Sequence, residues 1–336
     1  MRTIWQEEEK IAHIHGWDFS HIEGCYSEQT DFPWDYRAVI AQYLKPEIKI
    51  LDIDTGGGEF LLSLNHPHEN TAATENYPPN VDLCKEVLLP LGIDFRQGSG
   101  NGPLPFEENR FDMVIDRHGD FNAEEIYRVL KPGGYFITQQ VGAENDRELV
   151  ELLCGRTPLP FPEQYLNIAV DKFKKAGFRI LRSEECFRPI RFFDVGALVW
   201  FARIIQWEFP DFSVDTHYEN LLKAQKILEE KGFIEGSTHR FLLVAQKEEN
   251  NLNEAMKRIR CMEALFDRLQ SAFPAEKNEI WFQESLQKLI QYYESKLWRQ
   301  AFELDEQGLL PVGLKRGILS EDGIYNFLSD VQEEME

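Results

Sequence analysis

The feature that most constrains the fold is a regular alternation of strand-like and helix-like segments between residues 48 and 141. Alternation of this kind requires crossover connections, which are right-handed, and it predicts an α/β fold with a doubly wound, mostly parallel sheet. The run FDMVIDR has a largely continuous apolar stretch, as expected for a strand that is buried on both faces. The first five predicted strands are 48–54, 71–75, 93–97, 111–117 and 135–141.

Two later segments complete a seven-stranded sheet, at 179–185 and 240–247. The aromatic-rich stretch between them, 186–236, is too long for a simple connection and is predicted to form a helical lid insertion. Residues 1–46 are expected to form a helical cap. We therefore place the α/β domain at 47–248.

Beyond the polar stretch at 247–254, the pattern becomes purely helical. A second helix is predicted at 279–303, and Ser320 is expected to cap the N-terminus of a last helix. This pattern predicts a separate all-α accessory domain at 252–336. Its first helix carries an apolar stripe of Met256, Ile259, Met262, Phe266, Leu269 and Phe273.

Composition limits the class of partner. The chain has 36 basic and 58 acidic side chains, a formal net charge of -22, and no Lys/Arg-rich run, so its surface repels nucleic-acid phosphates. The five cysteines are scattered without a CxxC pair, which argues against a disulfide framework and a cysteine zinc site. Neither HIH at 13–15 nor HPH at 66–68 forms a recognisable ligand pattern, so no metal is predicted.

The N-terminus, MRTIWQEEEK, lacks the apolar segment of a signal peptide. No apolar stretch approaches the roughly 20 residues that are needed to span a bilayer. The sequence therefore predicts a cytoplasmic protein without membrane association.

The stretch ILDIDTGGGEF, residues 50–60, joins the first predicted strand to the first helix, which is the ligand-binding edge of such a sheet. It carries Asp52, Asp54 and Glu59. A pyrophosphate tolerates little negative charge in this position, whereas unit charges of opposite sign about 4 Å apart attract by roughly 4 kcal/mol at a surface-like dielectric. The turn is therefore predicted to bind a cation, and its spacing is not GxGxxG.

This turn resembles the first motif of the class I S-adenosylmethionine (SAM)-dependent methyltransferases, an acidic residue on the strand followed by GxGxG. Asp52 matches the acid, and Gly56 and Gly58 match the second and third glycines. Asp54 stands where the first glycine usually is. Since Asp tolerates left-handed backbone better than most residues, the turn can survive the change. SAM has no phosphate and a net charge of about +1, which agrees with the predicted cationic ligand.

Two later segments extend the resemblance. Glu75 ends the second strand where the family has an acid that binds both ribose hydroxyls, although NAD-binding folds carry an acid at a similar spacing. The stretch from 96 to 121 and EIYRVLKPGGYFITQQ match the family's third to fifth strands. The resemblance implies SAM as cofactor, bound by Asp52, Asp54, Gly56, Gly58, Glu75, Asn76, Gly98, Ser99 and Asp116.

Asp116 and His118 follow the fourth strand and are the candidates for acceptor orientation or proton removal. A hydrogen-bonded structural role for His118 is an equal alternative. Gln139 and Gln140, at the end of the fifth strand, carry less weight as substrate contacts. Methyl transfer is a direct displacement, so a dedicated base is optional.

The predicted function is methyl transfer from SAM to an acceptor that is a small molecule rather than nucleic acid. The chain lacks the N-P-P-Y and Pro-Cys steps of base methylation, but an RNA acceptor stays open. A non-catalytic SAM-binding module is the main alternative, because Asp54 and Ser99 depart from the family pattern. An NAD-dependent oxidoreductase is a second alternative.

The C-terminal segment resembles a small bacterial helical domain of unknown function, through YYESKLWRQAFELDEQGLLP and LKRGILSEDGIYNFL. This resemblance implies a domain boundary and no activity. It leaves open a protein partner for this domain.

Overall fold

The computed structural model describes residues 1–13, 19–248 and 252–334, and it divides the chain into two compact units, Met1–Glu248 and Glu249–Glu336. Two of the three residues in the HIH motif lie outside the described residues. None of the described helices is both long and apolar enough to cross a bilayer.

The first unit contains a sheet in the order β1-β7-β8-β6-β5-β2-β3-β4. The five strands from β2 to β6 run parallel, whereas β7 and β8 are antiparallel to their neighbours. The strands are β1 (Tyr26–Glu28), β2 (Ile50–Ile53), β3 (Thr71–Glu75), β4 (Asp94–Gln97), β5 (Phe111–Arg117), β6 (Leu130–Val141), β7 (Phe178–Phe192) and β8 (Ile234–Lys247).

The predicted doubly wound, mostly parallel sheet is confirmed, with one strand more than the seven expected. The additional strand, β1, pairs antiparallel with β7 at the sheet edge. It lies in the segment expected to be a helical cap, and its three residues, Tyr-Ser-Glu, are too short and too polar to produce an alternation that sequence reasoning can detect.

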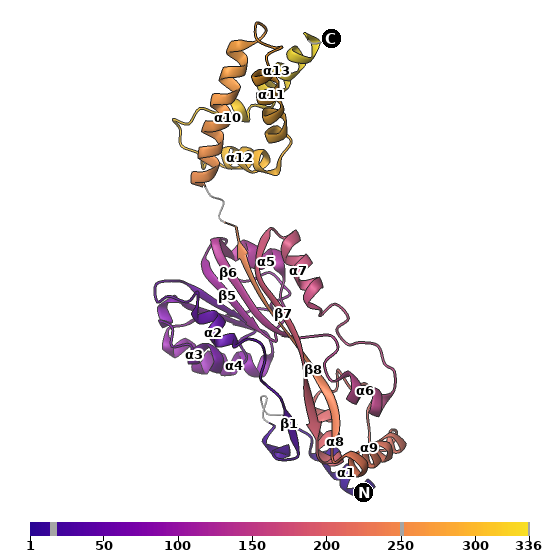
Figure 1. Cartoon of the computed structure of the whole chain (residues 1–336). Helices are drawn as coiled ribbons and strands as arrows, with labels where there is room; N and C mark the ends of the chain where they lie inside the picture. The colour runs from indigo at the N-terminus through magenta and orange to yellow at the C-terminus, as the bar shows by residue number, and fades with distance from the viewer. Residues whose placement is uncertain (14–18, 249–251, 335–336) are drawn as a thin grey trace. The chain divides into compact units, whose positions relative to one another are not determined.

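Helices cover both faces of the sheet (Figure 1). One face is covered by α2 (Tyr36–Ala41), α3 (Glu59–Ser63) and α4 (Pro78–Val87), and the apolar side chains beneath them form one core. The opposite face is covered by α5 (Ala123–Val129) and α7 (Leu166–Lys175), over a second core. Because both faces are buried, every residue of β2 and β3 is buried.

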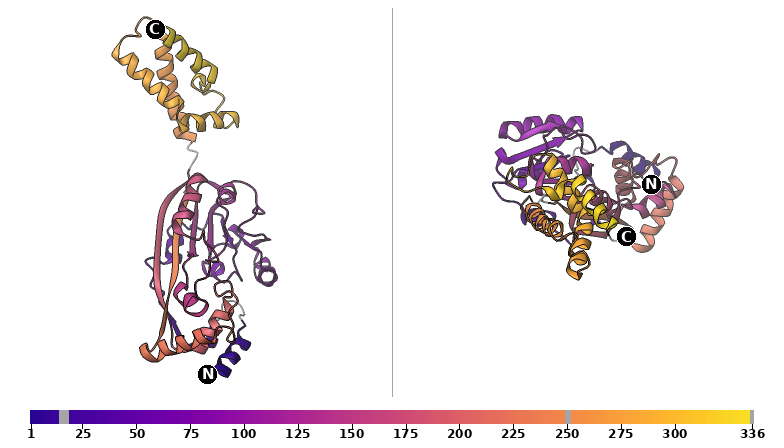
Figure 2. Two further views of the ribbon diagram at one scale, coloured as in Figure 1. Left: turned by 90° about the vertical axis from the view of Figure 1, so that its right-hand side faces the viewer. Right: turned by 90° about the horizontal axis from the view of Figure 1, so that it is seen from above.

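A third core lies around the ends of β7 and β8 that extend beyond the parallel strands (Figure 2). The expected lid at 186–236 is shorter in the structure, since β7 continues to Phe192 and β8 begins at Ile234. Nine of the ten residues of α8 are buried, so this helix is an interior element rather than an amphipathic cover. The helices of this core are α1 (Arg2–Ile11), α6 (Arg147–Cys154), α8 (Val195–Ile204) and α9 (Tyr218–Lys231).

The second unit is helical, with its own core. The prediction of one helix over 279–303 is wrong, because Ser295 accepts a hydrogen bond from the Trp298 N–H and starts a new helix. The expected cap at Ser320 is confirmed by its bond from the Gly323 N–H. The helices are α10 (Leu252–Ala272), α11 (Ile280–Tyr293), α12 (Lys296–Glu306) and α13 (Glu321–Glu333). Short 3-10 turns occur at Ser20–Ile22, His68–Asn70, Leu89–Leu91 and Gly317–Leu319.

Candidate functional site

Acidic side chains gather where the parallel strands end. Asp52 and Glu75 lie at the carboxyl ends of β2 and β3, and Asp116 lies at that of β5. Strands β2 and β5 are neighbours, with Ile53 paired to Asp116, and the chain order reverses between them. In open α/β sheets this switch point is the usual ligand site. We call Asp52, Asp54, Glu75 and Asp116 the carboxylate cluster.

Asp52 is almost completely buried and accepts a hydrogen bond of 2.6 Å from the Thr55 hydroxyl. Burial raises the pKa of Asp52 to about 7. The Thr55 bond and the Arg117 guanidinium oppose this rise, while Asp54 and Glu75 add to it. A carboxyl group of this kind is readily ionised by a cation that enters the site.

Asp54 adopts left-handed backbone, with φ of 50°, a conformation that favours glycine and is tolerated by Asp. Its carboxylate accepts hydrogen bonds from the N–H groups of Gly100, at 3.3 Å, and Asp120, at 3.2 Å. Burial, followed by repulsion from Glu75, raises the pKa of Asp54 to about 6, and the two N–H bonds moderate the rise. Asp54 therefore links the turn after β2 to the loops that follow β4 and β5.

Asp116 is wholly buried, and the groups that donate to it come from its own loop and from β6. It accepts hydrogen bonds from the Gly119 N–H at 3.0 Å, the Thr138 hydroxyl at 3.3 Å and the Gln140 amide at 2.7 Å. Burial, reinforced by Asp54, raises the pKa of Asp116 well above its usual range. These contacts make Asp116 a group that holds the ends of β5 and β6 together.

Glu75 accepts three short backbone hydrogen bonds. Its Oε1 atom accepts from the N–H groups of Asn76 and Tyr77, and its Oε2 atom accepts from Gly56, all at 2.8 Å. Oε2 also accepts a long hydrogen bond of 3.5 Å from the Asn80 amide. Because each carboxylate oxygen has about two acceptor sites, two short bonds saturate Oε1, whereas the second site of Oε2 holds only this long bond, which a better donor can replace. The side chain thus fixes the glycine turn against β3 and can still accept from one hydroxyl.

The glycines of the turn have the geometry that a close-approaching ligand needs. Gly56 has φ of 66°, and a Cβ placed on it would meet no atom within 4 Å, so the space in front of it is open. Gly58 has φ of 86° and precedes α3, and a Cβ there would lie 2.8 Å from the side chain of Leu88. Gly56 therefore leaves room for a ligand, while Gly58 is required by packing.

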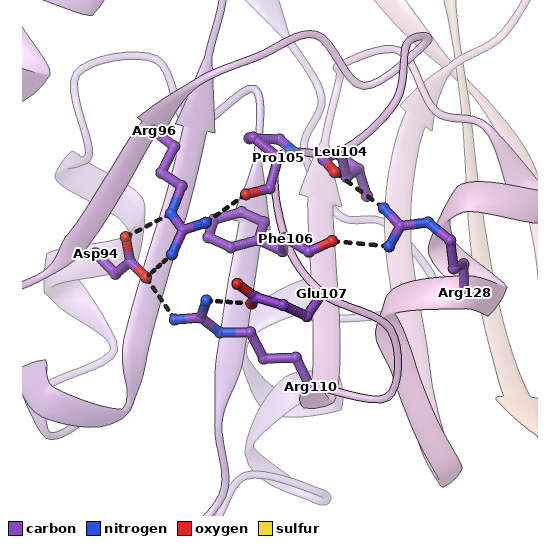
Figure 3. Close-up of polar contacts among 8 residues, drawn as sticks. All are labelled: Asp94, Arg96, Leu104, Pro105, Phe106, Glu107, Arg110 and Arg128. Atoms are coloured by element: carbon purple, nitrogen blue, oxygen red, sulfur yellow. Dashed lines mark hydrogen bonds and ion pairs between the residues drawn. The ribbon is translucent and has the colours of Figure 1, made fainter.

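The loop between β4 and β5 is held by arginine side chains (Figure 3). Arg96 donates to the Pro105 carbonyl at 2.5 Å, and Arg128 donates to the carbonyls of Leu104 and Phe106 at 2.9 and 2.7 Å. Both Arg96 and Arg110 also pair with Asp94, whose pKa is lowered by these hydrogen bonds and charges although partial burial opposes them. The loop is therefore an ordered wall of the site.

The N-terminal end of this loop closes over the carboxylate cluster. The Gly98 N–H donates to the Glu75 carbonyl at 3.1 Å, and the Ser99 hydroxyl accepts from the Asn101 N–H at 3.3 Å. Gly100 was not predicted as a site residue, yet a Cβ on it would lie 1.8 Å from the Asp120 carbonyl oxygen. Only glycine fits at this crossing of two loops.

A second group of residues lies beside the ends of β5 and β6. The Trp34 indole donates to the Gln139 Oε1 atom at 2.8 Å, so the Gln139 amide nitrogen faces His118 Nε2, 3.3 Å away. His118 Nε2 is then the acceptor, and the proton of the neutral ring is on Nδ1. Desolvation by the surrounding protein, with the nearby Arg240 and Arg117, lowers the pKa of His118 to about 3, although the residue is exposed at the surface.

Tyr36 anchors the N-terminal segment to this region. Its hydroxyl donates to the carbonyls of Asp116, at 2.8 Å, and Ile137, at 3.1 Å. Beside it is a cavity of about 510 Å³ in which aromatic rings alternate with polar groups. The cavity is lined by Thr30, Phe32, Pro33, Trp34, Asp35, Tyr36 and Gln139.

The chemistry of the donors fits a cationic cofactor with a hydroxylated ribose, and it does not fit a pyrophosphate. The carboxylate cluster supplies anionic oxygens, and the Arg117 guanidinium is a nearby positive charge that lowers the pKa of Asp52. A pyrophosphate would add negative charge to carboxyl groups whose pKa values are already raised. Within the described ranges, no group of three or more His, Cys, Asp or Glu residues could hold a metal ion.

The strand order and the anionic glycine turn define the α/β fold of the class I methyltransferases. Residues 51–138 match the family described as "Methyltransferase domain", and residues 246–336 match the family described as "Domain of unknown function (DUF4298)". The chain thus contains a methyltransferase domain, with SAM as the cofactor that this domain implies, and a C-terminal domain of the second family.

Curated relatives share part of the chain. A stretch of 175 residues is 29% identical to 24-methylenesterol C-methyltransferase 2 of Arabidopsis thaliana and covers 44% of this chain and 45% of that protein. A stretch of 111 residues is 32% identical to phthiotriol/phenolphthiotriol dimycocerosates methyltransferase of Mycobacterium tuberculosis, covering 31% and 40%. These matches span less than half the length of the relatives.

Among solved structures, the YcgJ protein of Bacillus subtilis is 17% identical to the superposed part of this chain. The superposition has a TM-score of 0.43 and covers 64% of this chain and 98% of that one.

Proposed function

We propose that this protein is a SAM-dependent methyltransferase that acts on a small-molecule acceptor. The observation that carries the proposal is the carboxylate cluster at the switch point of the sheet. Asp52, Asp54 and Asp116 have raised pKa values mainly because they are buried, and the charge of Asp54 raises the pKa values of Asp52 and Asp116 further. A sulfonium and an ammonium group would compensate the negative charge of such a cluster.

For the cofactor, the proposal assigns the ribose hydroxyls to Glu75 and the adjacent Asn76. The second acceptor site of Glu75 Oε2, which holds only the long 3.5 Å bond from the Asn80 amide, supports this assignment. The open space at Gly56 supports close approach of the cofactor to the turn, and Gly98 and Ser99 are assigned to the adenine side. When bound, SAM supplies an electrophilic methyl group with a neutral thioether as its leaving group.

For the acceptor, the proposal uses the cavity beside Tyr36. The names of the two relatives described above give a methylenesterol and phthiotriol or phenolphthiotriol dimycocerosates as their substrates, and both kinds of substrate are lipids. Thr30, Asp35 and Gln139 supply polar groups to the cavity and Phe32 an aromatic ring, so the cavity suits an acceptor with a polar group beside an apolar part. The formal charge of -22 opposes a nucleic-acid acceptor.

The contacts of the two predicted catalytic residues favour positioning over proton removal. Asp116 is wholly buried and already accepts three hydrogen bonds. His118 uses Nε2 toward Gln139 and has a low pKa, so it is a weak base whose Nδ1–H can donate to the acceptor. Alignment of acceptor and methyl group is therefore the main contribution that we assign to these side chains.

The experiment has a binding part and a turnover part. Calorimetry of the whole chain should give one SAM site, and tritiated methyl from SAM should enter the small-molecule fraction of a cell extract. Gly56→Val should abolish binding because the left-handed backbone and the open space both disappear. Gly155→Val is the matched control, since Gly155 also has a positive φ, 75°, and nothing within 4 Å of its Cβ position, but follows α6.

The outcomes separate the alternatives. SAM binding without label transfer to any fraction would favour a non-catalytic SAM-binding module. Label in the RNA fraction would favour an RNA methyltransferase, and a site that binds NADH instead of SAM would favour an oxidoreductase. Equal SAM affinity in the Gly56→Val variant and its control would refute the site assignment.

A further inference from the structure

Asp54 differs from its neighbours in the carboxylate cluster. The resemblance to class I methyltransferases places a glycine at this position, and the observed φ of 50° is the backbone that a glycine would provide. The chain has an aspartate instead, and its carboxylate is fixed by two N–H donors from two different loops. The side chain therefore adds a charge that the turn does not need for its conformation.

Of the three aspartates in the carboxylate cluster, Asp54 ionises most readily. The pKa is about 6 for Asp54 and about 7 for Asp52, and it is well above the usual range for Asp116. At pH 7.5 Asp54 is therefore the most fully ionised of the three. Two backbone N–H groups stabilise its charged form, which is the usual effect of donors on a carboxylate.

We propose that Asp54 is the specificity-determining residue by which this protein distinguishes the cationic methyl donor from its uncharged product. The inference rests on the proposed SAM-binding function. SAM has a net charge of about +1, whereas S-adenosylhomocysteine has lost the sulfonium and is neutral overall. The two molecules share their adenine, ribose and amino-acid groups, so a carboxylate in the site acts mainly on the charge by which they differ.

Because ligand binding and protonation are linked, this role predicts proton release on binding, which a purely structural role of Asp54 would not produce. A cation that binds near Asp54 and Asp52 lowers their pKa values, so SAM binding near pH 6 releases protons. The neutral product lacks this effect and should release far fewer. Preference for SAM over S-adenosylhomocysteine should consequently rise as the pH rises through 6, where Asp54 ionises.

The test is calorimetric titration of the full chain with SAM and with S-adenosylhomocysteine, at pH 6 and pH 8, in buffers of different ionisation enthalpy. Asp54→Asn keeps the shape of the side chain and its tolerance of left-handed backbone, and it removes the charge. The preference for SAM at pH 8 should fall about tenfold, or about 1.4 kcal/mol, which is the attraction of two unit charges roughly 12 Å apart at an effective dielectric of about 20. Proton release at pH 6 should fall with it.

Asp112→Asn is the matched control. Asp112 is also partly buried in this domain and accepts from the Lys49 N–H and from Lys131, but it lies near the start of β5, at the opposite end of that strand from Asp116. This variant removes the same charge and should leave the ratio of the two affinities unchanged. If the asparagine variant folds poorly, Asp54→Gly takes its place. This variant restores the common residue of the class, and the preference for SAM should fall by the same factor.

The results discriminate clearly. A preference for SAM that is the same, within twofold, in wild type and Asp54→Asn overturns the inference and leaves the proposed function intact. Equal proton release on binding the two ligands to the wild-type protein also overturns it, without any variant. Failure of the wild type to bind either ligand removes the proposed function, and the inference with it.

Discussion

Substitution of Glu75 provides the sharpest test of how the site is built. Its carboxylate accepts 2.8 Å hydrogen bonds from the N–H groups of Gly56, Asn76 and Tyr77, and the residue is 5% exposed. Hydrogen bonds to a charged acceptor contribute about 1.5–3 kcal/mol each, and a buried donor without an acceptor has a comparable cost. Glu75→Ala would leave three such donors unmatched, so loss of SAM binding in that variant could simply reflect unfolding.

Glu75→Gln isolates the effect more cleanly. The amide oxygen can keep two of the three bonds in neutral form, but the amide nitrogen then faces a backbone N–H group. We expect the free energy of unfolding to fall by about 3 kcal/mol. For a unit of this size that loss lowers the melting temperature by about 6–12 °C. It is a sizeable part of the 5–15 kcal/mol that typically stabilises a domain.

Differential scanning calorimetry of the full chain, without and with SAM, measures both consequences. Glu86→Gln, on the exposed side of α4, makes the same change of charge and should shift the melting temperature by less than about 2 °C. We also expect SAM affinity of Glu75→Gln to fall at least tenfold, since one ribose acceptor is replaced by a donor. A melting temperature and an affinity both equal to those of the control would refute the role assigned to this carboxylate.

Three further outcomes are expected. Gly100→Ala should separate the two loops, because its Cβ would lie 1.8 Å from the Asp120 carbonyl, and calorimetry should record SAM affinity reduced more than tenfold. Tyr36→Phe removes the hydroxyl that joins α2 to β5 and β6, and urea denaturation should show a loss of about 1–2 kcal/mol. The free energy of unfolding of the wild type should fall as the pH rises from about 4 to about 7, because Asp52 keeps its proton in the folded state after the unfolded chain has lost it. Asp52→Asn should make the free energy of unfolding less dependent on pH in this range.

The fold could be predicted from sequence where buried strands alternate with helices, and it could not where the signal is short. The parallel strands and the glycine turn have strong local patterns, which sequence reasoning uses directly. The three-residue strand β1 and the break at Ser295 depend on tertiary pairing and on one capping bond. The fifth strand, predicted at 135–141, begins earlier, because LKPGG at 130–134 belongs to the start of β6, with Gly133 at φ of 81°.

The carboxylate cluster was predicted as a set of residue types, but the groups that hold it were not. Asp54 bonds to Gly100 and Asp120, which are 46 and 66 residues away in the chain. Loops of that separation meet only because parallel strands end at one edge, and the register of that meeting is set by packing. Gln139 was considered as a substrate contact, whereas the hydrogen bond that it accepts from Trp34 required the folded sheet.

The electrostatics of the cluster also explain why a substitution that stabilises this protein should weaken its function. In the ligand-free protein, burial disfavours the ionised form of Asp52, so Asp52→Asn removes an unfavourable charge and keeps an oxygen that can accept the bond from the Thr55 hydroxyl. The same charge is what attracts a sulfonium, and an amide cannot replace it. Functional sites commonly keep such locally unfavourable groups, and the gain appears only when the ligand is bound.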